Sequence, residues 1–513
     1  MRLVQRNWAW GAPPTKLLGC LCLLVLWALR ADVIEQDAKS SEPSGLAAGV
    51  AVVDITPPVG IPHVNWGSQI HVLAEGVDPV GMRAAALVIS DGNDRFAMVD
   101  IDTKHIIPEL ASVVDRASQL TGIPPEHIRL GATHTHAGVD LSGERGPAGV
   151  DLTEYKEIYE NYLRARNDKI VGAIVEASSN LRPVHVYGAV GIGTININRR
   201  VRAQEGRPAA VGRNPDGFVD RDLPVIRMDD AQGNPYVIIA NFQCHGTVLA
   251  YENKFLSPDW VGMTRHAVEK AMPGTVCLFF QGAAGNQGPI EGFTGDLRVA
   301  HRLGETLGYE VVATALQVDT VKRQPRFEGF VESTAYQAKQ PWRVLGPRDG
   351  TLRLASKILE LPPRKYTADD IAEMEASKTD SKRKLDALRE SGSPLDIYQA
   401  RARLRRFSDL LERWQQPYDP TPLTVRVQVL RIGETAIVSM PGEPFAEIGV
   451  AVKKASPFPV TLFCGYSNGP GGNYMPIESE YQRGGYEVHR TPYSPDAASI
   501  VISEITKLFA QVQ

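Results

Sequence analysis

Five short apolar runs in this chain each lead directly into a polar or glycine-rich segment, and this pattern constrains the fold most strongly. The runs, each followed by its segment, are HIRLGA and THTH, YVIIANFQC and HG, VCLFF and QGAAGNQG, TAIVSM and PGEPF, and VTLFCG and YSNGPGGNY. Short apolar runs bounded in this way are typical of buried β-strands. Because ligands in open α/β architectures bind at the carboxyl ends of strands, we expect a site there. The sequence predicts an α/β fold, with one large domain of mixed sheets flanked by helices.

The residues after these runs are of types that bind metals. His134 and His136 stand two positions apart after the first run, and on a continuing strand both rings would point to the same face. His245 follows the second run, and Glu443 follows the fourth. Taken singly, each of these residues is as readily explained by packing or by a position on the surface. Together, two histidines, a carboxylate and an open position make a familiar catalytic zinc set.

Two other classes of metal site with a His-x-His motif fit poorly. The metallo-β-lactamase type requires HxHxDH, but here Asp140 stands one residue too late and no histidine follows it. Amidohydrolase barrels place the motif on their first strand, whereas roughly a hundred residues of a mature chain would precede His134. The cysteines are scattered, which argues against a structural zinc site.

The N-terminal segment has the order of a secretory signal. Arg2, Arg6 and Lys16 precede the apolar run LLGCLCLLVLWAL, and the small residue Ala31 follows. This order predicts a signal peptide over residues 1–31 and an exported protein, periplasmic or secreted. The run is shorter than the roughly 20 residues of a transmembrane helix, although an uncleaved N-terminal anchor stays open. Residues 32–48 are expected to form a flexible leader.

Two further features bear on organisation and partners. Residues 367–416 are highly charged and helical in pattern, with a break at SGSP, and predict a solvated helical hairpin inserted between β-rich segments. A partner-binding role for that hairpin stays open. The formal net charge of −4 does not suggest a nucleic acid as partner.

Seven segments resemble, in the same order, the motifs of the neutral/alkaline non-lysosomal ceramidases. They are VAVVDITPPVG, GATHTHAG, TININRR, CHGTVLAYENKFLSPDWVG, FFQGAAGNQGP, SMPGEPF and SNGPGGNYMPIESEYQRGGYE. The resemblance covers about residues 49–490, and residues 49–513 are therefore expected to form a catalytic domain. It implies a zinc-dependent amidase that cleaves the amide bond of ceramide or a related N-acyl lipid.

The resemblance also implies roles for single residues. The metal ligands would be His134, His245, Glu443 and Tyr474, where the twelve-residue spacing from Tyr474 to Tyr486 favours Tyr474 over Tyr466. His136 would lie beside a metal-activated water, and Arg199 and Tyr486 would face the substrate. General chemistry agrees, because zinc lowers the pKa of a bound water from about 16 to about 7. An imidazole can then move a proton, and a guanidinium or phenol can stabilise an oxyanion. Taken alone, an arginine such as Arg199, beside Arg200 and Arg202, is more often part of a charged surface with a salt bridge.

The chain departs from the family pattern in one loop. Where the family has a GDVSP segment, residues 285–289 read GNQGP, so Gly288 replaces the serine and offers no hydroxyl. We expect the loop amides, or Asn286 and Gln287, to serve as donors to an oxyanion instead.

The family's C-terminal immunoglobulin-like domain is expected to be absent, and that domain helps to build the lipid-facing surface. A smaller amide or ester therefore stays open as substrate, as do peripheral membrane contact and a non-catalytic role in binding a metal or lipid. Divalent ions other than zinc would also suit these ligands.

Overall fold

The computed structural model describes residues 45–63, 71–106, 108–139, 153–202, 208–469 and 473–513. The predicted signal peptide, residues 1–31, and all but the end of the predicted leader lie outside the described residues. Residues 43–513 form one compact unit. Its first strand, β1 (Ala47–Asp54), begins within the range predicted for the leader.

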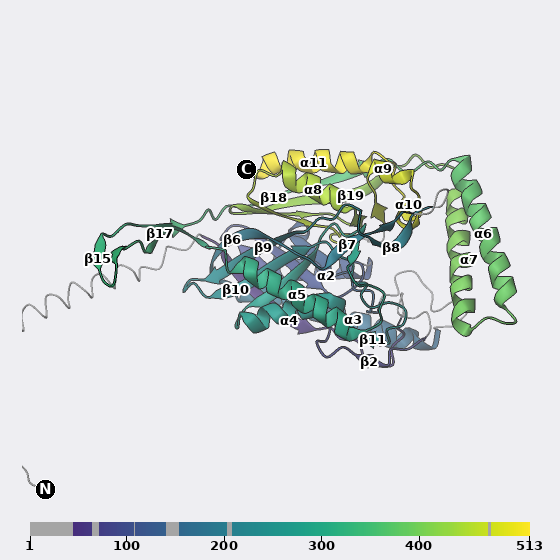
Figure 1. Cartoon of the computed structure of the whole chain (residues 1–513), viewed down its shortest axis with the longest axis horizontal. Helices are drawn as coiled ribbons and strands as arrows, with labels where there is room; N and C mark the ends of the chain where they lie inside the picture. Colours follow the sequence, from purple (N-terminus) through teal and green to yellow (C-terminus); the bar gives the residue numbers. More distant parts are fainter. Residues whose placement is uncertain (1–44, 64–70, 107, 140–152, 203–207, 470–472) are drawn as a thin grey trace, which may run out of the picture. The chain divides into compact units, whose positions relative to one another are not determined.

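Two sheets form the framework of this unit (Figure 1). In the eight-stranded sheet, the strands run in the order β12 (Val276–Gln281), β10 (Pro235–Phe242), β9 (Asp222–Asp230), β6 (Arg182–Ile192), β1, β3 (Arg83–Ser90), β4 (Arg95–Ile101) and β5 (Ile128–Ala132). In the four-stranded sheet the order is β18 (Leu352–Leu361), β19 (Leu423–Ile432), β20 (Thr435–Ser439) and β22 (Val460–Cys464). Both sheets mix parallel and antiparallel pairs, which confirms the predicted fold class.

Strand β3 shows how the sequence builds the layers. Ala85, Leu87 and Ile89 join a core cluster that also holds residues of the four-stranded sheet, such as Leu430 and Leu462. The alternate residues of β3, Ala84, Ala86 and Val88, join a second cluster with helix α3 (Lys156–Ser179). Successive side chains of a strand point to opposite faces, so a strand that is apolar at every position is buried on both.

Helices cover the outer faces of both sheets (Figure 1). Helix α3 packs on β1 and β3, and α2 (Ala111–Thr121) packs on α3, whereas α4 (Asp259–Ala271) and α5 (Leu297–Ala315) cover the β12–β9–β6 side. On the four-stranded sheet lie α8 (Ala446–Ala455) and α11 (Ala497–Val512). The resulting order is helices, sheet, sheet, helices.

Smaller elements connect these layers. The short strands are β2 (Gly76–Val77), β7 (Asn196–Val201), β8 (Ala210–Asn214), β11 (Phe255–Leu256), β13 (Gln287–Pro289), β14 (Val321–Pro325), β15 (Phe330–Glu332), β16 (Tyr336–Ala338), β17 (Trp342–Pro347), β21 (Glu443–Pro444) and β23 (Tyr474–Met475). The short helices are α9 (Glu478–Tyr481) and α10 (Tyr486–Arg490). None of the helices in the described ranges is long and apolar enough to cross a membrane.

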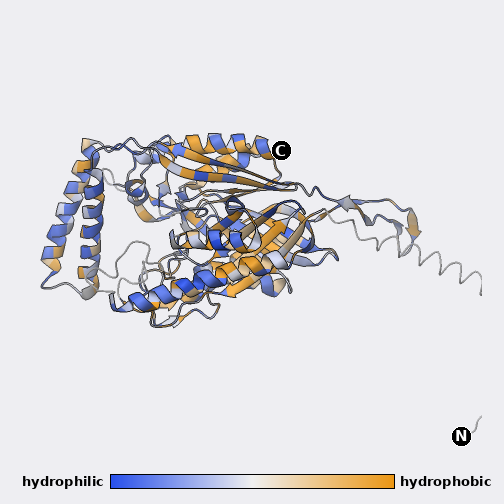
Figure 2. Cartoon of the chain, turned by 180° about the vertical axis from the view of Figure 1, so that it is seen from behind, coloured by the Kyte–Doolittle hydropathy of each residue, from blue (hydrophilic) through white to orange (hydrophobic). Residues whose placement is uncertain are grey.

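The range predicted as a hairpin, residues 367–416, contains α6 (Ala368–Leu388) and α7 (Pro394–Trp414), which lie side by side (Figures 1 and 2). In the sequence they stand between β18 and β19. Both helices begin with a capping box, Thr367 with Asp370 and Ser393 with Asp396, which satisfies amides of the first turn. Figure 2 shows that both helices are largely hydrophilic. At one end, however, α7 is anchored, because Trp414 packs on His489 of α10 with ring centroids 5.9 Å apart.

Candidate metal centre

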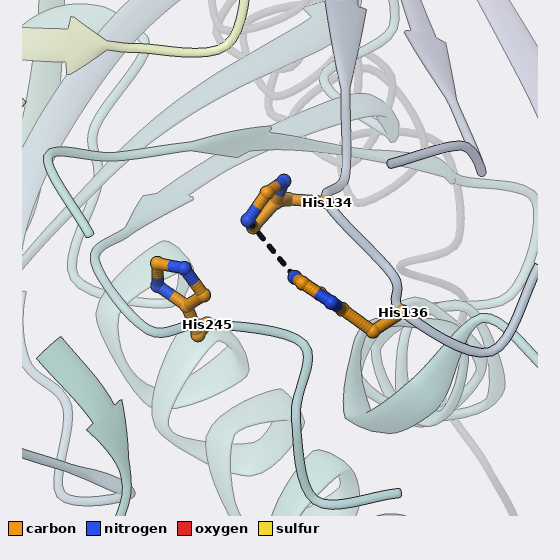
Figure 3. Close-up of side chains that lie close together, drawn as sticks. All are labelled: His134, His136 and His245. Carbon is orange, nitrogen blue, oxygen red and sulfur yellow. Dashed lines mark hydrogen bonds between the residues drawn. The ribbon is translucent and has the colours of Figure 1, made fainter. Parts of the chain in front are cut away.

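The strand ends meet as the sequence predicts. β5 leads to His134 and His136, β10 to His245, β20 to Glu443, and β22 to Tyr466. An isolated bridge between Thr135 and Gly246 joins the first two of these segments. The nitrogen ligand atoms of His134, His136 and His245 lie within 4.8 Å of one another, so these three imidazoles could hold a metal ion (Figure 3).

The two histidines of the His-x-His motif come together for a reason other than strand alternation. Strand β5 ends at Ala132, and His134 adopts a left-handed conformation with φ of 65°. The His136 amide then donates to the Gly246 carbonyl at 3.1 Å, so contacts outside the strand hold this segment. The Nε2 atoms of His134 and His136 are 3.1 Å apart (Figure 3). The sequence pattern therefore predicted the right pair of residues, but the strand geometry behind that expectation is wrong.

Backbone carbonyls orient two of the rings. The Nδ1 atoms of His134 and His245 lie 2.7 Å from the carbonyl oxygens of Lys104 and Ala284, so Nδ1 carries the proton and donates it. The Nε2 atom of each ring is then left with a lone pair that faces the site. This arrangement is usual for metal-binding histidines, because the outer hydrogen bond fixes both the tautomer and the ring orientation.

Glu443 supplies an oxygen atom at the point where the two rings converge. Its Oε2 lies 3.4 Å from Nε2 of His134 and 3.2 Å from Nε2 of His245. Burial favours the neutral form of this carboxyl, but the adjacent His134 and His245 outweigh it and hold the pKa of Glu443 well below its ordinary value. Burial and the charge of Arg199 lower the pKa of His245 to about 3. At neutral pH an anionic oxygen therefore faces the lone pair of a neutral ring.

A metal cation between Glu443 and His245 would bind both the anionic oxygen and the lone pair that face each other. Oε2 of Glu443 and Nε2 of His245 are both buried, and neither has a hydrogen-bond partner. Such atoms are costly unless an ion or another group satisfies them. Ligands at zinc–ligand distances of about 2.0–2.1 Å in a tetrahedral arrangement lie about 3.3 Å apart, close to the separations seen here. The nitrogen and oxygen donors thus fit a divalent metal.

Two tyrosines border the histidines. Tyr474, whose strand β23 pairs in parallel with β21 of Glu443, stacks on His245 with ring centroids 6.5 Å apart. Tyr466 lies closer to His134, with centroids 4.3 Å apart, and its buried hydroxyl has no partner. Burial, then the charge of Glu443, raises the pKa of both phenols well above the ordinary value. Tyr466, which the family spacing disfavours as a ligand, is thus also a residue of the site.

Arg199 lies inside the protein and not on a charged surface. It donates from Nε to Oε1 of Glu487 at 2.9 Å and from Nη2 to the Tyr474 hydroxyl at 3.0 Å. Arg200 is buried too, and it donates to the other oxygen of Glu487 at 2.6 Å. Tyr486 continues this layer, since its half-buried ring packs edge-on against Tyr474 with centroids 5.7 Å apart. The structure therefore brings Arg199, Tyr474 and Tyr486 together beside His245.

The amide side chains of the glycine-rich loop are used for packing, and the structure does not direct them to the histidines. Nδ2 of Asn286 donates to Glu447 at 2.8 Å, and Nε2 of Gln287 donates to the Phe218 carbonyl at 3.1 Å. In this structure one donor of each amide already has a protein partner, and their expected role toward an oxyanion stays a prediction. The loop contributes through its backbone, because the Gln287 carbonyl accepts from the His245 amide at 3.2 Å.

His105 is a further residue of the site that the sequence analysis did not single out. Its ring is buried and lies 5.2 Å from the His134 ring, centroid to centroid. Burial first, and the charge of Lys104 next, keep its pKa well below the ordinary value. The signal was present, because β4 is another apolar run that leads into polar residues, DTKH.

Comparisons with known proteins identify relatives of this chain. The profile of the family "Neutral/alkaline non-lysosomal ceramidase, N-terminal" matches residues 46–294. The neutral ceramidase of Pseudomonas aeruginosa is 25% identical over 93% of this chain and 72% of its own length. Neutral ceramidase A of Dictyostelium discoideum is 29% identical over 50% of this chain, and the match spans only 37% of that relative.

The solved structures show the same fold. The crystal structure of the Pseudomonas aeruginosa ceramidase superposes with a TM-score of 0.61 at 20% identity, covering 91% of this chain and 74% of that one. The two chains thus share their fold over most of this chain. From its profile match, its relatives and its fold, this chain belongs to the neutral/alkaline non-lysosomal ceramidase family.

Proposed function

We propose that this protein is an exported, zinc-dependent hydrolase that cleaves the amide bond of ceramide or a related N-acyl lipid. The observation that carries the proposal is the convergence of two buried Nε2 atoms on one carboxylate oxygen, Oε2 of Glu443. Related proteins support the substrate class, since a solved relative is described as a ceramidase complexed with C2. His134, His245 and Glu443, with Tyr474 or Tyr466, would hold the metal. When bound, that ion would supply the Lewis acidity that activates water at neutral pH.

The other side chains have roles that follow from their charge and position. Burial and the neighbouring His134 and Lys104 keep the pKa of His136 well below its ordinary value. Its imidazole is therefore neutral at pH 7 and can serve as the base that accepts a proton from the attacking water. It can then deliver that proton to the leaving amine. Arg199 is cationic and polarises the Tyr474 hydroxyl, so this pair can stabilise negative charge on the carbonyl oxygen.

The direct test is to measure turnover of a ceramide, a short amide and a short ester by purified protein reconstituted with zinc. We expect release of fatty acid from a short-chain fluorescent ceramide, at a rate that follows the bound zinc. Hydrolysis of a short amide or ester without hydrolysis of ceramide would favour the smaller substrate. Stoichiometric zinc with no hydrolysis of any of these would contradict the proposal and favour a binding protein.

Restoring the family serine at position 288 tests whether that hydroxyl is needed. A Cβ at Gly288 would lie 3.4 Å from Cβ of Arg199, an ordinary contact, and the residue sits in β13 opposite Ile197. We expect Gly288→Ser to fold normally and to change kcat/KM for the ceramide by less than about tenfold, because the proposed chemistry runs through His136 and Arg199. Steady-state kinetics and thermal melting measure both effects.

Gly285 provides the contrast in the same loop. A Cβ there would lie 2.5 Å from the backbone oxygen of Glu443, so Gly285→Ser must displace that segment. We expect a lower Tm and weaker zinc binding for this variant only. An increase in turnover of a hundredfold or more in Gly288→Ser would instead show that the missing hydroxyl limits the reaction.

A further inference from the structure

The hairpin of α6 and α7 places a cation beside the candidate site. Arg406 of α7 lies over the ring of Tyr486, with its guanidinium carbon 5.3 Å from the ring centroid. Arg490, at the end of α10, approaches the same ring to 5.5 Å. Two guanidinium groups, from segments more than 80 residues apart in sequence, therefore share one aromatic ring.

Neither of these cations is paired with a carboxylate among the described residues, although neighbouring arginines are. Glu487 is used by Arg199 and Arg200, Glu480 pairs with Arg200, and Asp370 pairs with Arg364. Arg406 is half-buried, and its Nε is buried without a hydrogen-bond partner. Burial lowers the pKa of Arg406, and the like charges of Arg490 and Arg403 oppose its own charge further. An anion bound at this point would pair with Arg406 and would offset the free-energy cost of its burial and of its repulsion by the neighbouring arginines.

Arg406 and Arg490 lie close to the candidate metal centre. Tyr486 packs on Tyr474, and Tyr474 stacks on His245, so the cations lie two aromatic rings away from the candidate metal ligands. Arg490 is also near enough for its charge to act on Glu443 and His105. A group held at these arginines would therefore lie beside the candidate metal centre.

We infer that Arg406 and Arg490 form an anion subsite that binds a carboxylate or phosphate group of the substrate. This inference rests on the proposed function, and it predicts that, among N-acyl lipids, those with an acidic group are preferred over neutral ones. A guanidinium matches either anion with two parallel hydrogen bonds, and such bonds to charged groups are the strong ones. The subsite depends on the hairpin, which gives the insertion between β18 and β19 a role in specificity.

Matched substrates test the inference. Dodecanoylglycine carries a carboxylate, dodecanoylethanolamine is its neutral counterpart, and the phosphate ester of the latter carries a phosphate. We expect kcat/KM to be at least about tenfold higher for one of the two anionic compounds than for the neutral one. In Arg406→Gln and in Arg490→Gln that ratio is expected to fall toward one. Arg401→Gln is the control, since Arg401 is exposed on the same helix and should leave the ratio unchanged.

Binding to the metal-stripped protein separates this inference from the proposed function. Calorimetry should show tighter binding of the favoured anionic compound, with the difference lost in Arg406→Gln. Anion-selective binding without turnover of any amide would support the subsite and contradict the hydrolase proposal. Turnover of all three compounds at similar kcat/KM, with similar affinities, would overturn the subsite and leave the hydrolase standing. A preference for carboxylate over phosphate, or the reverse, would identify the group.

Discussion

Replacing His245 with alanine is expected to abolish both metal binding and turnover. His245 is fully buried, its orientation is set by the Ala284 carbonyl, and its Nε2 faces Oε2 of Glu443. Loss of an outer-shell partner typically costs 10–100-fold in metal affinity, and loss of a ligand should cost more than about a hundredfold. His134→Ala should behave in the same way. The measurement is zinc content after dialysis against a zinc buffer, with ceramide turnover on the same samples.

Two further variants test whether a loss of zinc could result from unfolding or from the removal of any histidine. Glu443→Gln keeps the side-chain volume and removes the charge that faces the two imidazoles, so zinc should be lost while the fold is retained, as circular dichroism would show. His266→Ala removes an exposed histidine of α4 and should change neither zinc content nor turnover. Wild-type protein without zinc, or full zinc occupancy in His245→Ala, would overturn the ligand assignment.

Replacing Arg265 with methionine is expected to cause the largest loss of stability. Arg265 of α4 is buried and donates to Asp100 at 2.9 Å and to Asp102 at 2.6 Å, on and just after β4. Its removal leaves two buried carboxylates without their cation, which typically costs about 3–5 kcal/mol. Burial raises the pKa of Asp100 even with Arg265 present, which shows how costly its charge is at this position. Equilibrium unfolding in denaturant measures the free energy of unfolding.

This ion network also reaches the candidate metal centre. Thr103, next to Asp102, accepts a hydrogen bond from the His134 amide at 3.0 Å. Weaker zinc binding is therefore expected in the folded fraction of Arg265→Met. Arg298→Met is the matched control, because Arg298 pairs with Asp296 at 2.7 Å but its side chain is 90% exposed. Exposed pairs contribute about 0–1 kcal/mol, so equal effects of the two substitutions would contradict the argument.

Much of the site could be predicted from local sequence, because buried strands and the residues that follow them leave a clear apolar-to-polar pattern. That pattern located His134, His136, His245 and Glu443, and the charged helical pattern with its break at SGSP indicated both helices of the hairpin. It could not assign hydrogen-bond partners. Asn286 and Gln287 look like free donors in a glycine-rich loop, yet the folded chain occupies them with Glu447 and Phe218.

The amino-acid sequence by itself determined the layers of the fold, the family and the chemical type of the site. These properties follow from residue patterns of short range. Only the tertiary structure decided which groups meet: Arg199 with Glu487 across 288 positions of sequence, Tyr466 with His134, and Arg406 with Tyr486. Such pairs depend on how separate sheets and an inserted hairpin pack, and charge and burial at the site follow from that packing.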